Sequence, residues 1–163
     1  DLVDSPLGRR PLRSALRTRI VDVWTHEQDI REALGRPGNL DSPAAAVYVE
    51  RMLALLPRLV VDQVGLEPGK VVMIELTGPV LARTGVRVER AEDGTVSGKA
   101  MFAGGTDETG PIPVIGKTTS LQMSTEVFAR RTAGRRATAD CVYSVHGDAE
   151  VARLLMDALS VMP

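Results

Sequence analysis

Apolar side chains recur at the spacing of an α-helix in the first part of the chain. No Gly or Pro interrupts this pattern between residues 12 and 34. Pro11 suits the first turn of a helix, and Gly35 with Pro37 after it is a typical helix end. The pattern predicts a helix over 12–34 with one apolar stripe at the border of a core, formed by Leu12, Leu16, Ile20, Val23, Ile30 and Leu34.

A second helix is predicted directly after a short turn. Ser42 is a good N-cap residue and Pro43 a good first helical residue. The helical pattern runs to about Leu56, or continues to Val61 with a kink at the intervening proline. Because the connection over 35–42 is short, the two helices should lie side by side and antiparallel.

The pattern changes from helical to extended after residue 65. Short runs rich in Val and Ile, or alternating in polarity, predict strands, and Asp93-Gly94 predicts a hairpin turn. Helical patterns return later, one ending before Gly134 and one capped by Asp148. The expected strands are 70–76, 86–90, 96–102, 119–123 and 140–146, the expected helices are 125–132 and 149–159, and 104–116 is expected to be a long surface loop.

This order of elements predicts an α+β protein in two parts. A helical hairpin occupies 1–63, and a mixed α+β domain occupies 66–163. Two helices alone cannot bury both of their faces, so the first part should need a partner segment. The chain begins at Asp1 rather than Met, and we therefore expect it to be a piece of a longer protein.

Composition excludes several classes of protein. The apolar fraction of 44% excludes a disordered chain, and no apolar run approaches the roughly 20 residues of a membrane-spanning helix. A net charge of −1 argues against a general nucleic-acid binder. The lone Cys141 allows no internal disulfide, which fits a reducing cytoplasm. We expect a cytoplasmic protein that acts on small molecules, without nucleic-acid or membrane partners.

The strongest candidate chemistry lies on the first predicted helix. Asp22, His26 and Asp29 stand at i, i+4 and i+7, which places them in one row beside the apolar stripe. A carboxylate and an imidazole one turn apart can bind one divalent metal, and this pair of donors suits zinc. The same spacing is also common for a plain ion pair on a helix. Asp22 and His26 are therefore candidate metal ligands that need at least one further ligand.

The residues around this row resemble a known family. The stretch 23–31 (VWTHEQDIR), followed by ALGRPG at 33–38, resembles the last bundle helix of the mycothiol-dependent maleylpyruvate isomerase family. Residues 128–136 (FARRTAGRR) and 145–148 (VHGD) resemble a helix and turns of that family's C-terminal domain. The resemblance implies the C-terminal part of a DinB-like four-helix bundle, followed by a small sterol-carrier-like mixed α+β domain.

The resemblance also implies a metal and a low-molecular-weight thiol, mycothiol. In the family, an acidic residue and a His four positions later, with a His from an earlier helix, hold a divalent metal, usually zinc. Asp22 and His26 match the first two ligands, although the better-known members have Glu at the acidic position. The earlier His has no counterpart, because the only other His of this chain is His146. The metal activates the thiol or a water, and the thiolate attacks an electrophilic carbon.

A basic residue of the family's C-terminal domain holds the anionic substrate. Arg135 is the nearest match and is the candidate catalytic residue, with Arg131 and Arg136 as substitutes. Arginine suits this role because its planar fork binds a carboxylate through two hydrogen bonds. An Arg near a helix C-terminus can also be a solvated residue that the helix dipole favours, and this alternative stays open.

Three other side chains could take part in chemistry but have simpler explanations. Cys141 should lie in the core, and His146 should have a capping or surface role. Glu27 falls within the apolar stripe, where it could support a metal ligand, act as a general base or pair with an Arg.

Three hypotheses about function follow. The first is a metal- and mycothiol-dependent isomerase or thiol transferase for a small electrophilic, anionic substrate. The second is a non-catalytic protein that binds a small molecule or lipid in its C-terminal domain. The third is a regulator that contacts nucleic acid through a basic cluster, formed by Arg9, Arg10, Arg13, Arg17 and Arg19.

Overall fold

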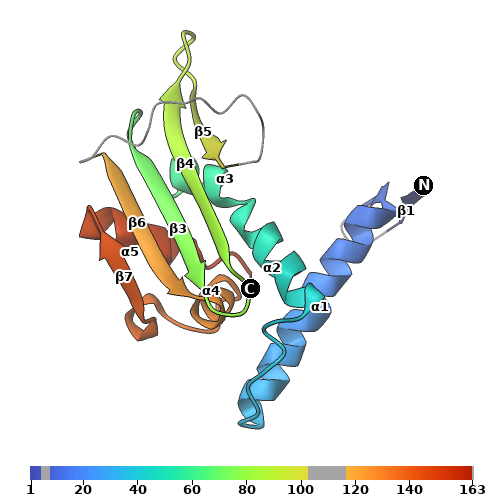
Figure 1. Cartoon of the computed structure of the whole chain (residues 1–163). Helices are drawn as coiled ribbons and strands as arrows, with labels where there is room; N and C mark the ends of the chain where they lie inside the picture. Colours follow the sequence, from blue (N-terminus) through green and yellow to red (C-terminus); the bar gives the residue numbers. More distant parts are fainter. Residues whose placement is uncertain (5–7, 103–116, 163) are drawn as a thin grey trace.

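The computed structural model describes residues 1–4, 8–102 and 117–162 (Figure 1). Its helices are α1 (Leu12–Ala33), α2 (Pro43–Leu53), α3 (Leu56–Asp62), α4 (Thr125–Thr132) and α5 (Ala149–Ala158), with one 3-10 turn, η1 (Thr138–Asp140). Its strands are β1 (Leu2–Val3), β2 (Arg10–Pro11), β3 (Val71–Thr77), β4 (Ala82–Arg90), β5 (Val96–Met101), β6 (Thr118–Ser124) and β7 (Tyr143–His146). This content confirms the predicted α+β class.

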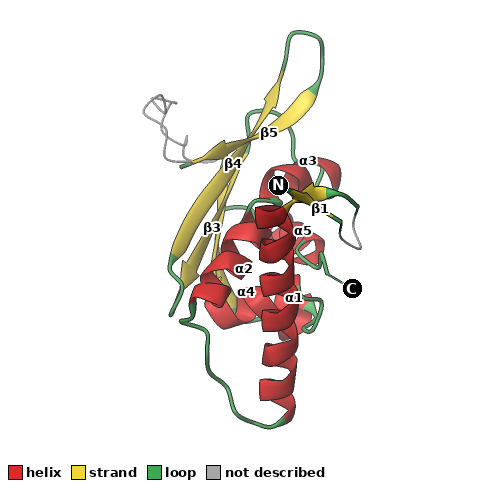
Figure 2. Cartoon of the chain, turned by 90° about the vertical axis from the view of Figure 1, so that its right-hand side faces the viewer, coloured by secondary structure: helices red, strands yellow, loops and turns green. Residues whose placement is uncertain are grey.

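A five-stranded sheet forms one layer of the molecule. The strand order is β5-β4-β3-β6-β7, in which β3 and β6 are parallel and the other neighbours are antiparallel. The helices gather on one side of this sheet, and α1 lies farthest from it (Figures 1 and 2). Alternate residues of the two central strands point into the core, among them Ile74 and Leu121, which are fully buried.

The buried apolar residues form a single cluster that draws on both predicted parts of the chain. It extends from Val21 on α1 to Leu159 beyond α5. Tyr48 joins α2 to α4, because its hydroxyl donates to the Ala129 carbonyl at 3.2 Å and lies 2.8 Å from the Thr132 hydroxyl. Burial is the main reason that the pKa of Tyr48 rises to about 12. The helical hairpin and the sheet thus share one core.

The apolar stripe of α1 faces outward, which corrects the expectation that it borders a core. Its six members remain between 38% and 64% exposed. The buried side of α1 is instead formed by Val21, Trp24, Thr25 and Gln28. The connection to α2 folds over this side: Trp24 donates to the Asn39 carbonyl and Gln28 to the Gly38 carbonyl. Burying the large indole of Trp24 stabilises the fold more than burying the smaller side chains of the stripe would, so the Trp24 side of α1 faces the core.

The second predicted helix is two helices. α2 ends at Leu53 and α3 begins at Leu56, with Pro57 in its first turn, where a proline removes no helical hydrogen bond. α3 then packs closely on β5. A Cβ atom at Gly98 would lie 2.5 Å from the Pro57 carbonyl oxygen, so only glycine allows this approach.

Two strand boundaries also differ from the prediction. β4 begins at Ala82 rather than near residue 86, because its pairing with β3 extends to the contact between Leu76 and Ala82. The predicted strand over 140–146 is shorter, since η1 takes up its first residue. The predicted loop over 104–116 lies outside the described residues.

The two faces of α1 should respond differently to truncation. Trp24→Ala removes a 2% exposed side chain that packs on Tyr48 with ring centroids 4.8 Å apart. We expect it to lower the free energy of unfolding by about 3–5 kcal/mol, whereas the neighbouring Val23→Ala, 58% exposed in the parent, should change it by less than about 0.5 kcal/mol. Urea denaturation of both variants measures this; similar losses would contradict the orientation of α1.

Candidate functional site

The helix α1 places its polar row as the spacing predicts. His26 stands between two carboxylates: its Nε2 atom lies 3.6 Å from Asp22 Oδ1, and its Nδ1 atom lies 3.6 Å from Asp29 Oδ2. Both ring nitrogens therefore face an acidic side chain. The His26 side chain is 65% exposed and that of Asp22 44%, so the row faces solvent rather than the edge of a core.

The distance between Asp22 and His26 suits two ligands of one metal. Ligands about 2.1 Å from a tetrahedral metal stand about 3.4 Å apart, close to the observed 3.6 Å. The second Asp22 oxygen, Oδ2, accepts a hydrogen bond from Arg19 Nη1 at 2.7 Å, which leaves Oδ1 toward the imidazole. An oxygen and a nitrogen donor fit zinc. Among the described residues no cluster of three or more His, Cys, Asp or Glu could hold a metal, so these two donors would need a further ligand.

Arg135 reaches the same row from the other part of the chain. Its Nη2 atom lies 3.2 Å from Asp29 Oδ2, and its Nε atom 3.3 Å from both oxygens of that carboxylate. Arg135 also donates from Nη1 to the Ala133 carbonyl, which holds the side chain against the end of α4. The fold thus joins Arg135, the candidate catalytic residue, to Asp29, which lies beside the candidate metal ligand His26.

Asp29 also binds Arg130. The Arg130 side chain is only 6% exposed; its Nη1 donates to Asp29 Oδ1 at 2.9 Å, and its Nη2 pairs with Glu32. Burial alone would raise the pKa of Asp29, but hydrogen bonds from Arg135 and Arg130, with their charges, hold that pKa below its usual value. Asp29 is thus an ionised carboxylate shared by two arginines.

The two substitutes for Arg135 have other partners. Arg131 is buried and donates to the carbonyls of Met156, Arg136 and Asp157, so it ties α4 to the end of α5. Arg136 makes a paired hydrogen bond with Glu126. Of these three arginines, Arg135 is therefore the one that contacts the polar row of α1.

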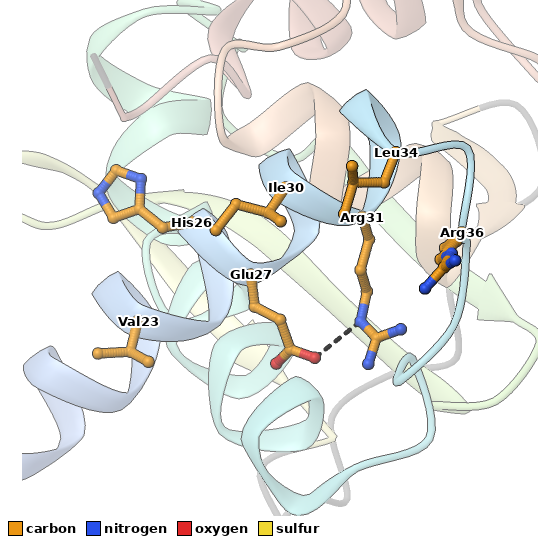
Figure 3. Close-up of a pocket in the computed structure, with 7 residues that line it drawn as sticks. All are labelled: Val23, His26, Glu27, Ile30, Arg31, Leu34 and Arg36. Carbon is orange, nitrogen blue, oxygen red and sulfur yellow. Dashed lines mark hydrogen bonds and ion pairs between the residues drawn. The ribbon is translucent and has the colours of Figure 1, made fainter.

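A shallow groove lies along the exposed stripe of α1, next to His26. It has a volume of about 520 Å³ and is lined by Val23, His26, Glu27, Ile30, Arg31, Leu34 and Arg36. Figure 3 shows Val23 and His26 at one end of it and Leu34 and Arg36 at the other. The lining combines apolar side chains with Arg36 and the ion pair of Glu27 with Arg31, so it offers both apolar and polar contacts to a small molecule.

Glu27 pairs with an arginine, one of the three roles open to it. Its carboxylate accepts from Arg31 Nε at 2.7 Å and from Asn39 Nδ2 at 2.8 Å (Figure 3). The hydrogen bond from Arg31 is the main reason that the pKa of Glu27 lies below its usual value, and Asn39 adds to it. A carboxylate held ionised in this way is a weak proton acceptor, so the contacts favour a structural role.

The remaining candidates lie away from this row. Cys141 is partly buried against the core and donates to the Ala137 carbonyl; burial raises the pKa of its thiol, and the charges of Arg131 and Arg136 offset only part of that rise. His146 is exposed at the end of β7. In the basic cluster, Arg17 pairs with Glu50, and Arg19 with Asp22 as described above.

Arg130 and Asn39 are contributors that the sequence did not single out. Arg130 is one of several arginines in 130–136, and nothing in their spacing shows which of them turns toward α1. Asn39 has a left-handed backbone, with φ of 60°, at which Asn is tolerated better than most residues. Its place in a turn was visible in the sequence, whereas its contact with Glu27 depends on how that turn folds back.

Comparison with protein-family models, curated proteins and solved structures finds no match for this chain. Among the described residues, no helix combines the length and apolar character needed to cross a membrane.

The buried arginine should matter more for stability than an exposed one. Arg130→Gln removes contacts to both Asp29 and Glu32, and we expect a loss of roughly 1–3 kcal/mol in the free energy of unfolding. Arg58→Gln breaks a pair with Asp62 whose arginine is 84% exposed, and should cost less than about 0.5 kcal/mol. Equal effects in denaturant titrations would show that Arg130 does not hold α1 in place.

Proposed function

We propose that this chain carries the metal and substrate-binding residues of a mycothiol-dependent isomerase or thiol transferase that acts on a small electrophilic, anionic substrate. One observation carries the proposal. His26 on α1 and Arg135 beyond α4 approach the same carboxylate, Asp29, although more than a hundred positions separate them in the chain. The proposed metal ligand and the proposed anion-binding arginine are thus neighbours of one carboxylate, which supports a reaction between a thiolate and an anionic electrophile.

The proposal includes the finer description of the fold. The helices of residues 1–63, α1 to α3, are proposed to be the last part of a DinB-like bundle, and residues 66–163, from β3 to α5, to be a sterol-carrier-like domain. The outward stripe of α1 supports the first half, because a bundle helix has apolar side chains on more than one face. The sheet covered on one side by helices supports the second half.

The proposed ligands of a divalent metal, such as zinc, are Asp22 through Oδ1 and His26 through Nε2, with a third ligand from outside the described residues. When bound, such a metal lowers the pKa of a thiol or water so that a nucleophile is available at neutral pH. Arg19 holds the other oxygen of Asp22 and so fixes which oxygen faces the imidazole. The exposure of both ligands leaves room for a thiol to approach.

The proposed substrate is a small carboxylate with an electrophilic carbon. Arg135, 30% exposed, would bind the substrate carboxylate while Asp29 holds the guanidinium in place. The groove beside His26, at about 520 Å³, falls in the size range of small-molecule pockets, and its apolar side chains would contact the apolar part of the substrate. In this arrangement the chain binds, orients and shields the reactants.

Metal binding is the first test of the proposal. In equilibrium dialysis with Zn²⁺, the wild-type chain should bind metal, and His26→Ala and Asp22→Asn should each weaken binding at least about tenfold, because each removes one of two donors. His146→Ala, which changes an exposed His elsewhere, serves as the matched control and should bind as the wild type does.

Two outcomes would contradict this proposal. One is a wild type that binds no more Zn²⁺ than His26→Ala. The other is stoichiometric lipid extracted from metal-free purified protein, which would favour the non-catalytic hypothesis. A second pocket of about 380 Å³ in the α+β part, lined by Leu66 and Val151 together with Lys70 and Lys117, is where such a ligand would be sought.

The role of Arg135 is tested by substrate charge. With mycothiol as the thiol, Arg135→Lys should lower kcat/KM for a carboxylate-bearing electrophile by roughly tenfold to a hundredfold, since lysine cannot make the paired hydrogen bonds. The same electrophile as a neutral ester should be affected little. Arg136→Lys, whose parent binds Glu126, is the control. An equal loss on acid and ester would show that Arg135 does not bind the carboxylate.

A further inference from the structure

We propose that Asp29 is the positioning residue of this site: its carboxylate orients the imidazole of His26 for metal binding and at the same time holds the guanidinium of Arg135. This inference rests on the proposed function. It assigns to one side chain the task of fixing how the metal ligand and the anion-binding arginine stand relative to one another.

The two nitrogens of His26 face different carboxylates. Nε2 lies 3.6 Å from Asp22 Oδ1, and Nδ1 lies 3.6 Å from Asp29 Oδ2. The nitrogens of an imidazole point away from one another, so one metal cannot be bound by both. With Asp22 and Nε2 on the metal side, Asp29 stands on the opposite side of the ring. A His that ligates a metal commonly donates its second N–H to a carboxylate, which fixes the tautomer and the ring orientation. Asp29, at 3.6 Å, stands on the side of the ring where such an acceptor is needed, just beyond hydrogen-bond distance.

Asp29 is held firmly enough to orient a neighbour. Its Oδ1 accepts from Arg130 Nη1 at 2.9 Å, and the Arg130 side chain is almost fully buried between α1 and α4. Arg135 binds the same carboxylate from a second direction through Nε and Nη2. His26, by contrast, is mostly exposed and has no such anchors on its own helix beyond the two carboxylates. The fixed partner is therefore Asp29, and the oriented one is the imidazole.

One oxygen atom links the two candidate functional side chains. Oδ2 of Asp29 lies 3.2 Å from Arg135 Nη2 and 3.6 Å from His26 Nδ1. A movement of this oxygen would change the direction of the imidazole and that of the guanidinium together. Loss of the carboxylate should therefore weaken metal binding and substrate binding at once, whereas a loss at Arg135 alone should affect substrate binding.

Glu32 provides a matched control on the same helix. It pairs with the same Arg130 but stands six residues from His26, almost two turns along α1. Glu32→Gln removes one acidic partner of Arg130 and one negative charge, as Asp29→Asn does. Only Asp29 has the contacts to His26 and Arg135 on which the inference depends.

The experiment is a Co²⁺ titration of the whole chain, followed by its visible absorption. The variants are Asp29→Ala, the isosteric Asp29→Asn and Glu32→Gln, each checked for folding by circular dichroism. We expect the Kd for Co²⁺ to rise about 10- to 100-fold in Asp29→Ala, the range typical for loss of a carboxylate behind a metal-binding His. Asp29→Asn, which keeps an acceptor oxygen, should recover part of the affinity. Glu32→Gln should bind as the wild type does.

Turnover with mycothiol and a carboxylate-bearing electrophile supplies a second measurement. At saturating metal, Asp29→Ala should raise KM and lower kcat, whereas Arg135→Lys should act mainly on KM. In the double variant Asp29→Ala/Arg135→Lys, the loss of transition-state stabilisation calculated from kcat/KM should be smaller than the sum of the losses in the two single variants. Both substitutions disturb the same contact between Asp29 and Arg135.

The outcomes separate this inference from the proposed function. If the wild type binds Co²⁺, His26→Ala does not, and Asp29→Ala or Asp29→Asn binds as tightly as Glu32→Gln, the role of Asp29 is overturned and the proposed function stands. If the wild type and His26→Ala are equally weak in Co²⁺ binding, the proposed function fails and this role fails with it. If Asp29→Ala does not fold and Asp29→Asn does, the comparison of Co²⁺ affinity between Asp29→Asn and Glu32→Gln decides whether Asp29 has this role.

Discussion

The ion pairs that join Asp29 to Arg130 and Arg135 are the contact on which the rest of the site depends. They connect a helix near the start of the chain to α4 and the turn that follows it, more than a hundred residues later. Arg130 is nearly buried, so its charge needs a partner; an unpaired cation there would be costly. That requirement, together with the burial of Trp24, sets the rotation of α1 about its axis and turns Asp22 and His26 toward solvent. The position of the candidate metal ligands is thus a consequence of packing and charge compensation elsewhere on the helix.

α1 has two faces that differ in what they contact. The side with Trp24 packs on Tyr48 and joins the common core, whereas the more regular apolar stripe stays exposed. A helix that is apolar on two sides gains from burying both. The groove along the exposed side is bordered by His26, so this uncovered apolar surface lies next to the candidate chemistry.

Charges of both signs alternate around His26. Asp22 and Asp29 flank the ring, and each is itself held by arginine. Such an arrangement fixes the direction of both carboxylates and places the guanidinium of Arg135 3.2 Å from Asp29. Arg19 fixes the direction of the Asp22 carboxylate, and the separation of that carboxylate from the imidazole suits two ligands of one metal.

Local patterns determined much of this protein. The period of apolar residues predicted α1, the Ser42-Pro43 pair predicted the start of α2, and Asp93-Gly94 predicted the turn between β4 and β5. The i, i+4, i+7 spacing placed Asp22, His26 and Asp29 in one row, because helix geometry depends on neighbours alone. The tertiary structure decided which face of α1 is buried and that Arg135, rather than Arg131 or Arg136, meets Asp29. Those outcomes depend on packing and charge compensation between distant segments, which no local pattern encodes.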